Sequence, residues 1–278
     1  MHCSFKMDII KRNFLRAIRS GAFNDTEPFE AMSIFKWNKL LNIIISQNVI
    51  SVAIKGMKNC NYENIPYETV YGFFKTYNID INETTNEKVC IPRSDLNNMF
   101  LNKRLANLRH KELHSIDTSI ETLDLLNIII YNTNKILTHG IAYNNLLLIG
   151  KYLRNKGDKV DFVKLEHWLQ YLELHAMAQY EGSILITTLC FDMQEVPFVH
   201  NIDRIAYNRA LKALDNIIKN DSELEWHFRQ SKSGILHNNS VLLRNNIWHS
   251  MKYINYAPLE TISNLINRMA NSLSEIEE

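Results

Sequence analysis

The sequence is poor in the residues that build tight turns, with only 8 glycines and 5 prolines among 278 residues. A fold made of many β-hairpins needs such residues at its turns, so that class is disfavoured. Cysteine is also scarce, and the four cysteines (Cys3, Cys60, Cys90 and Cys190) lie far apart and form no C-x-x-C pair. This spacing is neither that of a disulfide scaffold nor that of a zinc ribbon, and it is typical of a reducing cytoplasm.

Long apolar runs are absent. The most apolar stretch, 43–54, is interrupted by polar residues at 46–48, and it is shorter than the roughly 20 residues that cross a bilayer. The N-terminal letters MHCSFKMDIIKRNF lack the charged start, apolar core and small-residue cleavage site of a signal peptide. We therefore expect a cytoplasmic protein with no membrane span, whose translation starts at Met1 or Met7.

Neither sign of charge dominates, because 31 Lys and Arg stand against 30 Asp and Glu, for a net charge of +1. This balance excludes a globally basic surface for nucleic acid or anionic membrane, although it allows a local patch. Hydrophobic residues make up 46% of the chain and charged residues 22%, which is the composition of an ordinary globular protein.

The common catalytic and phosphate-binding motifs are missing. The sequence contains no G-x-x-x-x-G-K-[ST], no G-x-G-x-x-G and no G-x-S-x-G, so the usual phosphate-cradling and nucleophile-elbow loops are absent. None of the four cysteines has a recognisable nucleophile context, and we interpret them as small buried hydrophobic residues. The sequence therefore predicts no catalytic residue and no cofactor from these patterns.

Apolar residues recur at helical spacing along most of the chain. The expected helices cover about 5–21, 34–46, 49–57, 66–77, 92–114, 118–139, 143–155, 161–176, 183–191, 202–220 and 258–273. The segment 184–189 also suits a short strand, because Ile and Thr favour the pleated state, but its neighbours are all helical. We predict an all-α globular bundle of about ten or eleven helices, with an N-terminal region 1–115 and a C-terminal region 116–278 packed as one unit.

Several residues mark helix ends. Thr118-x-x-Glu121 matches a capping box, in which two side chains bind otherwise unpaired N–H groups, and Asp161 is expected to cap the helix that follows it. The last helix follows Pro258 and has a clear apolar stripe. The residues of that stripe are Leu259, Ile262, Leu265, Ile266, Met269 and Leu273.

Two histidines stand one helical turn apart at His110 and His114, with Glu112 between them. That spacing can hold a metal ion, which makes these three residues candidate metal ligands. The pattern differs from H-E-x-x-H, because its glutamate stands at the wrong offset to face a metal-bound water. The alternative interpretation places both histidines on a solvated helix face.

The window 227–259 contains no Asp or Glu. Basic residues interleaved with aromatic ones can bind phosphate backbones and stack on bases, so the window is a candidate patch for anions or nucleic acid. Its basic residues are Arg229, Lys232, Arg244 and Lys252. Four positive charges are few against the roughly 6–10 phosphate contacts of many nucleic-acid binders, and a packed helix with a mildly basic rim is the alternative.

Within this window, Arg244-Asn245-x-x-x-His249 resembles the R-N-x-x-x-H motif of HEPN-type ribonucleases. His249 would act there as a general base while Arg244 steadies the charge of the phosphate. A motif of six residues also arises by chance. The basic N-terminal helix offers a further candidate surface for a partner or a membrane, with a core-packed helix as the alternative. Its basic residues are Lys6, Lys11, Arg12, Arg16 and Arg19.

The segments 14–23 (FLRAIRSGAF) and 40–53 (LLNIIISQNVISVA) resemble the N-terminal helices of a bacterial family of uncharacterised nucleotidyltransferases. The segment 139–153 (HGIAYNNLLLIGKYL) is similar to the H-G-I-G-L-R-Q-L-x-D-x-x-x-x-L stretch of that family. The segments 161–166 and 195–198 are similar to its later helices. The resemblance covers about half of the chain and keeps the same order.

The catalytic core of such enzymes has no counterpart here. The resemblance implies a Gly-rich turn and a D-x-D pair on a strand that hold two Mg²⁺ ions around a nucleoside triphosphate. This chain passes from Leu113 almost directly into the helix expected at Thr118, and its nearest approximation to the acidic pair is Asp80-Ile-Asn82. The resemblance therefore implies helical surroundings without a catalytic core, and it transfers no catalytic residue.

Three functions follow as hypotheses. The first is a non-catalytic scaffold or accessory protein that binds a protein or peptide in a groove between helices. The second is a diverged enzyme, or its substrate-recognition subunit, that acts on nucleotides or peptides. The third is a nucleic-acid-binding protein, or a metal-independent ribonuclease, that uses the window 227–259.

Overall fold

The computed structural model describes residues 7–60, 64–77, 90–115, 118–215 and 247–274, with side chains up to residue 270. Throughout these ranges the regular structure is helical and no strand occurs, which confirms the predicted all-α fold. The eleven α-helices with ten or more residues in the described part agree with the expected number. The segment 184–189 lies inside a helix, so the strand interpretation is wrong.

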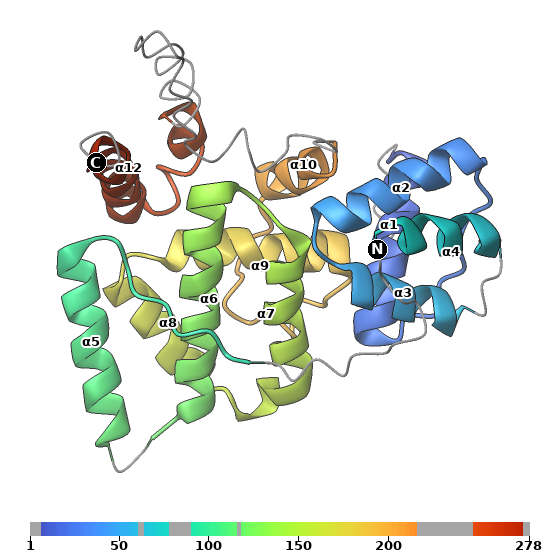
Figure 1. Ribbon diagram of the computed structural model, residues 1–278. Helices are drawn as coiled ribbons and strands as arrows, with labels where there is room; N and C mark the ends of the chain where they lie inside the picture. The colour runs from blue at the N-terminus through green and yellow to red at the C-terminus, as the bar shows by residue number, and fades with distance from the viewer. Residues whose placement is uncertain (1–6, 61–63, 78–89, 116–117, 216–246, 275–278) are drawn as a thin grey trace, which may run out of the picture.

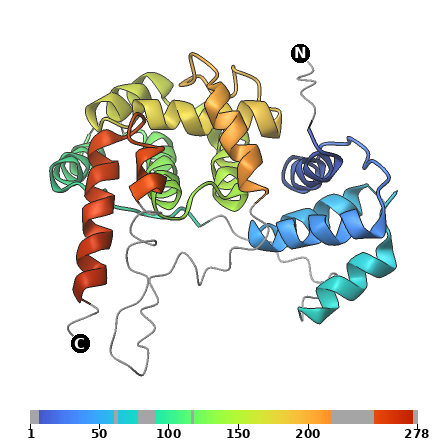
Figure 2. The same ribbon diagram turned by 90° about the horizontal axis from the view of Figure 1, so that it is seen from above.

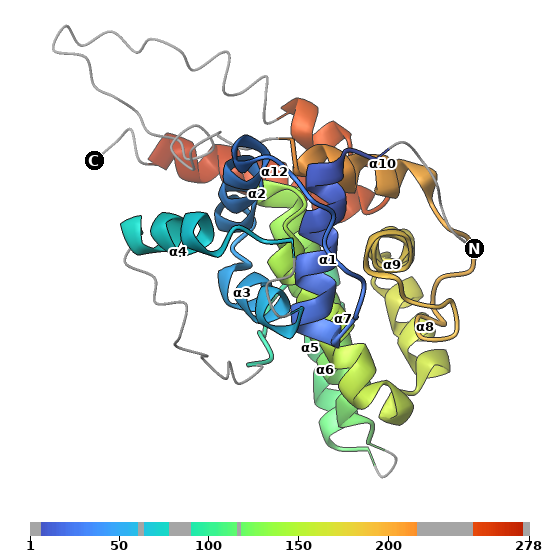
Figure 3. The ribbon, with the colours of Figure 1, turned by 90° about the vertical axis from the view of Figure 1, so that its right-hand side faces the viewer.

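The first four helices form one end of the molecule (Figure 1 and Figure 3). They are α1 (Ile9–Phe23), α2 (Ile34–Ser46), α3 (Ile50–Asn59) and α4 (Tyr67–Thr76). The helices α1 and α3 cross closely at Gly21 and Gly56. A Cβ atom on Gly21 would lie 1.8 Å from the carbonyl oxygen of Val52, and one on Gly56 would lie 2.0 Å from that of Ala17. Only glycine permits this approach of the two backbones.

The remaining helices build the larger part of the molecule. They are α5 (Met99–Leu113), α6 (Ile120–His139), α7 (Tyr143–Lys156), the 3₁₀ helix η1 (Gly157–Lys159), α8 (Phe162–Tyr171), α9 (His175–Leu189), α10 (Arg204–Ala213) and α12 (Pro258–Ser274). The helix α6 packs against α5, α7, α8, α9 and α12. Seen from above, α12 lies on one side of the molecule and α1–α4 on the other (Figure 2).

Buried contacts join the two groups of helices. The helix α1 packs against α7 and α9, and the rings of Phe14 and Tyr143 meet edge to face with centroids 5.3 Å apart. The Gln47 side chain accepts a hydrogen bond from the backbone N–H of Tyr143 (3.0 Å) and donates one to the carbonyl of Ala213 (3.4 Å). The helix α5 precedes the predicted boundary at residue 115, yet it packs against α6.

The predicted helix caps have opposite outcomes. Asp161 caps α8 as expected, since its Oδ1 accepts a hydrogen bond from the N–H of Lys164 (2.9 Å). The capping box at Thr118 is wrong, because α6 begins at Ile120 and its N-cap residue is Ser119, whose side chain makes no capping bond. The Thr118 hydroxyl instead donates to the carbonyl of Glu112 (3.1 Å). Of the helices described, none has the length and apolarity needed to span a membrane.

Candidate functional site

The three candidate metal ligands do not come together. The rings of His110 and His114 stack with centroids 4.3 Å apart, and both side chains are exposed. Glu112 is buried and binds Lys164 Nζ (2.7 Å) and the N–H of Ser119 (2.6 Å). The cause is the spacing, because residues two apart on a helix do not share a face. In the ranges that the structure describes, no group of three or more His, Cys, Asp or Glu residues is placed to hold a metal ion.

The predicted nucleic-acid patch falls largely outside the described residues, which include neither Arg229, Lys232 nor Arg244. Lys252 is exposed. The ring of His249 donates a hydrogen bond from Nε2 to the carbonyl of Ile136 (3.1 Å), near the end of α6. Burial lowers the pKa of His249 to about 4, so the ring is neutral at pH 7. Its observed contact is with a helix end, and the ribonuclease hypothesis stays a prediction.

The basic side of α1 is matched by an acidic loop of the same chain. Its three arginines form ion pairs with carboxylates of the segment 24–33, and Lys11 pairs with Asp215 (2.7 Å). Hydrogen bonds from Arg12 and Arg16 lower the pKa of Glu30 to about 2. These cations are therefore neutralised within the chain, which leaves little charge there for a partner or a membrane.

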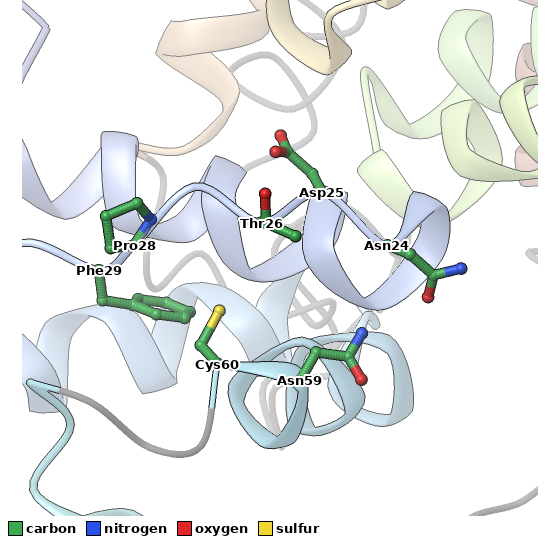
Figure 4. Close-up of a pocket in the computed structure, with 7 residues that line it drawn as sticks. All are labelled: Asn24, Asp25, Thr26, Pro28, Phe29, Asn59 and Cys60. Carbon is green, nitrogen blue, oxygen red and sulfur yellow. The ribbon is translucent and has the colours of Figure 1, made fainter.

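Two cavities lie at the end of α1. The larger has a volume of about 420 Å³ (Figure 4). Two of the residues that line it, Asn59 and Cys60, contact Ser20 of the same chain. The Asn59 amide donates to the carbonyl of Ser20 (2.9 Å), and Cys60 Sγ lies 3.7 Å from Ser20 Oγ. The residues that line it are Asn24, Asp25, Thr26, Pro28, Phe29, Asn59 and Cys60.

The smaller cavity has a volume of about 300 Å³ and is bordered by Arg19, Arg154 and Cys190. Arg19 Nη1 donates to Cys190 Sγ (2.6 Å). Cys190 and Cys90 are exposed and Cys60 is half-buried, so the interpretation of the cysteines as buried residues is wrong for these three. Each arginine also has a carboxylate partner, since Arg19 Nε lies 3.1 Å from Asp25 and Arg154 Nε lies 3.0 Å from Glu195. The positive charge beside this cavity is therefore balanced locally.

A buried carboxyl group lies in the core between α6 and α9. Glu181 is 1% exposed, and its Oε1 accepts a hydrogen bond from the Thr133 hydroxyl (3.0 Å), while Oε2 has no hydrogen-bond partner among the residues that the structure describes. Burial raises the pKa of Glu181 to about 8, so the group is mainly protonated at pH 7. Glu181 lines neither of the two cavities described above. We therefore expect this group to affect the pH dependence of the stability of the fold.

The helix α12 exposes its apolar side chains and buries its polar ones. An amphipathic helix ordinarily turns its apolar stripe toward the core and its polar side to water. The orientation of α12 is the reverse, because its polar residues Glu260, Thr261 and Asn264 are buried. The apolar residues Leu259, Ile262 and Ile266 are exposed, Ile266 by 58%.

Hydrogen bonds explain why the polar side of α12 faces inward. The Glu260 carboxylate accepts bonds from the backbone N–H and the side-chain amide of Asn97 (2.5 and 2.7 Å) and from the N–H of Asn98 (3.0 Å). The Asn98 amide donates to Ser263 Oγ (3.0 Å), and the Asn264 amide donates to Thr138 Oγ1 (3.2 Å). These bonds attach α12 to the start of α5 and the end of α6.

A short helical segment at 247–251 adds two exposed apolar side chains, Trp248 (61% exposed) and Met251. This segment lies beside α12 (Figure 1 and Figure 2), and Arg268 of α12 is close enough to His249 to affect its pKa. We call the exposed residues together the α12 outer surface. It consists of Trp248, Met251, Leu259, Ile262 and Ile266.

The segment 247–274, which carries the α12 outer surface, contains three charged residues of the Asp, Glu, Lys and Arg types. Within 247–274 the only carboxylate is Glu260, which is buried against α5. The cationic residues of the same segment are the exposed Lys252 and the half-buried Arg268. Arg268 follows the buried Asn264 by one helical turn and its Nη1 is buried, so it lies on the inward side of α12. The exposed charge of this segment is therefore the positive charge of Lys252.

Sequence reasoning found the stripe on α12 but not its exposure. Periodicity shows which apolar residues share a helix face, whereas the polar contacts that hold the other face inward join residues about 160 positions apart. The sequence feature that could have indicated the exposed stripe is the row of polar residues on the other side of the helix, where Glu260 stands three residues before Ser263.

The chain matches no protein-family model, no curated protein in sequence and no solved structure in fold. The resemblance of its helices to nucleotidyltransferases therefore stays a prediction.

Proposed function

We propose that this chain is a non-catalytic helical accessory protein that binds an acidic amphipathic helix of a protein partner on the α12 outer surface. The observation that carries the proposal is the reversed orientation of α12, with Glu260 buried and Ile266 exposed. A helical partner reads such a stripe through side chains at positions i, i+3 and i+7, which is the spacing of Leu259, Ile262 and Ile266.

The energetic reason is the apolar area that the stripe leaves in water. Burying one Leu or Ile side chain stabilises a complex by about 1.5–3 kcal/mol before the costs of association are subtracted. The exposed Trp248 is a residue type enriched among those that dominate binding at protein interfaces. Partner binding would cover these side chains without disturbing the hydrogen bonds on the opposite side of α12.

The charge of the segment 247–274 favours an acidic partner. Lys252 is exposed, and the one carboxylate of this segment, Glu260, is occupied by Asn97 and Asn98. An acidic side chain beside a partner's apolar stripe would meet the positive charge of Lys252 and avoid repulsion. This complementarity distinguishes the proposed partner from a basic amphipathic helix.

The proposed origin is a relative of the nucleotidyltransferase family that retains helical parts only. It is supported by the order of the similar segments and by the missing D-x-D pair. Nucleotidyl transfer by the purified chain with Mg²⁺ and a nucleoside triphosphate would refute the non-catalytic function.

The test is site-specific photo-crosslinking in a lysate of cells that naturally contain the chain. A photoreactive phenylalanine replaces Ile266, and in the control it replaces Val163, an exposed residue on α8. We expect an adduct at 266 only, mapped by mass spectrometry to an acidic amphipathic segment. A synthetic peptide of that segment should bind the chain, and Ile262→Ser should weaken binding by about tenfold or more.

Other adducts would contradict the proposal. Equal crosslinking at positions 163 and 266, an adduct to a second copy of this chain, or crosslinking to lipid would each assign the α12 outer surface another role. Binding of the purified chain to anionic vesicles, lost in Ile266→Ser, would identify it as a membrane surface instead.

A further inference from the structure

The stretch 33–77, which includes α2, α3 and α4, has an excess of positive charge. It contains five lysines, two glutamates and no Asp or Arg, while the whole chain has a net charge of only +1. The five lysines are Lys36, Lys39, Lys55, Lys58 and Lys75. All except the half-buried Lys58 are exposed.

These lysines differ from the arginines of α1 in their surroundings. The α1 arginines bind carboxylates of the neighbouring loop, whereas none of the ion pairs formed among the described residues includes a lysine of 33–77. Their charge therefore remains available at the surface, where it attracts anions.

Exposed aromatic rings lie among these lysines. Phe35 is 67% exposed, and Lys39 Nζ lies 4.7 Å from the centre of its ring. On α4 the rings of Tyr67 and Tyr71 stack, with centroids 6.1 Å apart and planes 18° apart, and both are exposed. Lys75 follows Tyr71 by one helical turn.

The two helices that carry these rings are neighbours. The helix α2 packs against α4, and Trp37 on α2 and Phe74 on α4 are both buried. Figure 3 shows α2, α3 and α4 together at the end that faces the viewer. The exposed rings and the lysines therefore share one end of the molecule.

We infer that the outward faces of α2 and α4 form a binding surface for single-stranded nucleic acid, separate from the α12 outer surface. Each base of a single strand has an unpaired face that stacks on an aromatic ring, while lysines bind the phosphates between the bases. A duplex keeps its bases stacked inside. An anionic membrane offers phosphates but no ring to stack on Phe35.

The test measures binding of the full chain to a fluorescent oligodeoxythymidine of about 20 nucleotides by anisotropy. With the three lysines of α2 and α4 on the phosphates, log Kd should rise with log salt with a slope of about 2. Phe35→Ala should weaken binding about tenfold, by loss of one stacked base. The double variant Lys36→Gln with Lys39→Gln should weaken binding and lower the salt slope by about 1.4.

Matched controls come from α5, which carries the exposed Phe100 and Lys103. Phe100→Ala and Lys103→Gln should leave the affinity unchanged, and thermal melting should show that every variant folds, because all these side chains are exposed. The inference is overturned by no binding at about 20 mM salt, by equal losses in the α5 variants, or by duplex binding that Phe35→Ala does not affect. Binding to anionic vesicles without binding to the oligonucleotide would overturn it in favour of a membrane.

Discussion

The carboxylate of Glu260 on α12 accepts a hydrogen bond from the backbone N–H of Asn98 (3.0 Å), the residue that caps α5. The Asn98 side chain in turn accepts hydrogen bonds from the N–H groups of Phe100 (3.0 Å) and Leu101 (3.1 Å). A negative charge is favourable at a helix N-terminus, where unpaired N–H groups and the helix dipole both point outward. One buried carboxylate therefore fixes both the start of α5 and the orientation of α12.

Replacing this carboxylate should loosen α12. Glu260→Ala removes a charged acceptor of three hydrogen bonds, and we expect it to lower the free energy of unfolding by about 1.5–3 kcal/mol. Urea denaturation followed by circular dichroism measures the change. The control is Glu173→Ala, whose exposed contact with Arg104 (3.4 Å) should contribute less than about 1 kcal/mol. Equal losses in the two variants would contradict the role of Glu260.

The crossing of α1 and α3 should not tolerate a methyl group. Gly56→Ala places a Cβ atom against the carbonyl of Ala17, so the helices must separate, and we expect a loss of about 2 kcal/mol or more. In the exposed Gly72→Ala on α4, nothing lies within 4 Å of the new Cβ atom. That control should gain about 0.5–1 kcal/mol from helix propensity. A Gly56→Ala protein as stable as the wild type would show that the crossing is looser.

Glu181 predicts a stability that falls as the pH rises. Burial raises its pKa in the folded chain to about 8 from the ordinary value of 4.5, so unfolding releases a proton between these values. Stability from this group is complete below pH 4.5 and is lost as the pH rises through 8, by at most about 1.4 kcal/mol per pH unit. The neutral Glu181→Gln should lack this slope. Parallel curves for the two proteins between pH 4.5 and 8 would contradict the prediction.

His249 predicts the opposite slope in a lower range. Burial lowers its pKa to about 4 from the ordinary value of 6.5, so the folded chain binds fewer protons than the unfolded chain between these values. Stability from this group is present above pH 6.5 and is lost as the pH falls through 4. We expect the wild type to lose stability over this range relative to His249→Gln, whose amide can still donate to the Ile136 carbonyl. The contributions of Glu181 and His249 have opposite slopes between pH 4.5 and 6.5, so each variant is compared with the wild type at the same pH. A difference in free energy of unfolding between wild type and His249→Gln that does not change with pH would refute the buried neutral ring.

Much of the fold follows from local sequence. The helix expected at 143–155 is α7 (Tyr143–Lys156), and the cap expected at Asp161 is present. Both depend on neighbours within a few residues, which periodicity and capping preferences describe well. The cap expected at Thr118 failed because Ser119, the actual N-cap, gives its N–H to Glu112 from the preceding helix.

The candidate site depends on contacts that no local pattern contains. The apolar stripe of α12 is visible in the sequence, but its exposure follows from Asn97 and Asn98, which lie more than 160 positions before their partners on α12. Glu112 likewise forms an ion pair with Lys164, 52 positions later, and does not share a site with the neighbouring histidines. Long-range polar pairing of this kind decides which side of an amphipathic helix faces water.

The most direct measurement is therefore the accessibility of the two sides of α12. Ile266→Cys and Asn264→Cys are each treated with N-ethylmaleimide, and mass spectrometry follows modification at that site, with the exposed native Cys90 as the internal standard. We predict that the thiol at position 266 reacts as fast as Cys90, while the thiol at position 264 is protected until the chain unfolds. Rapid labelling at 264 with protection at 266 would show that α12 buries its apolar stripe, and the proposed docking surface would not exist.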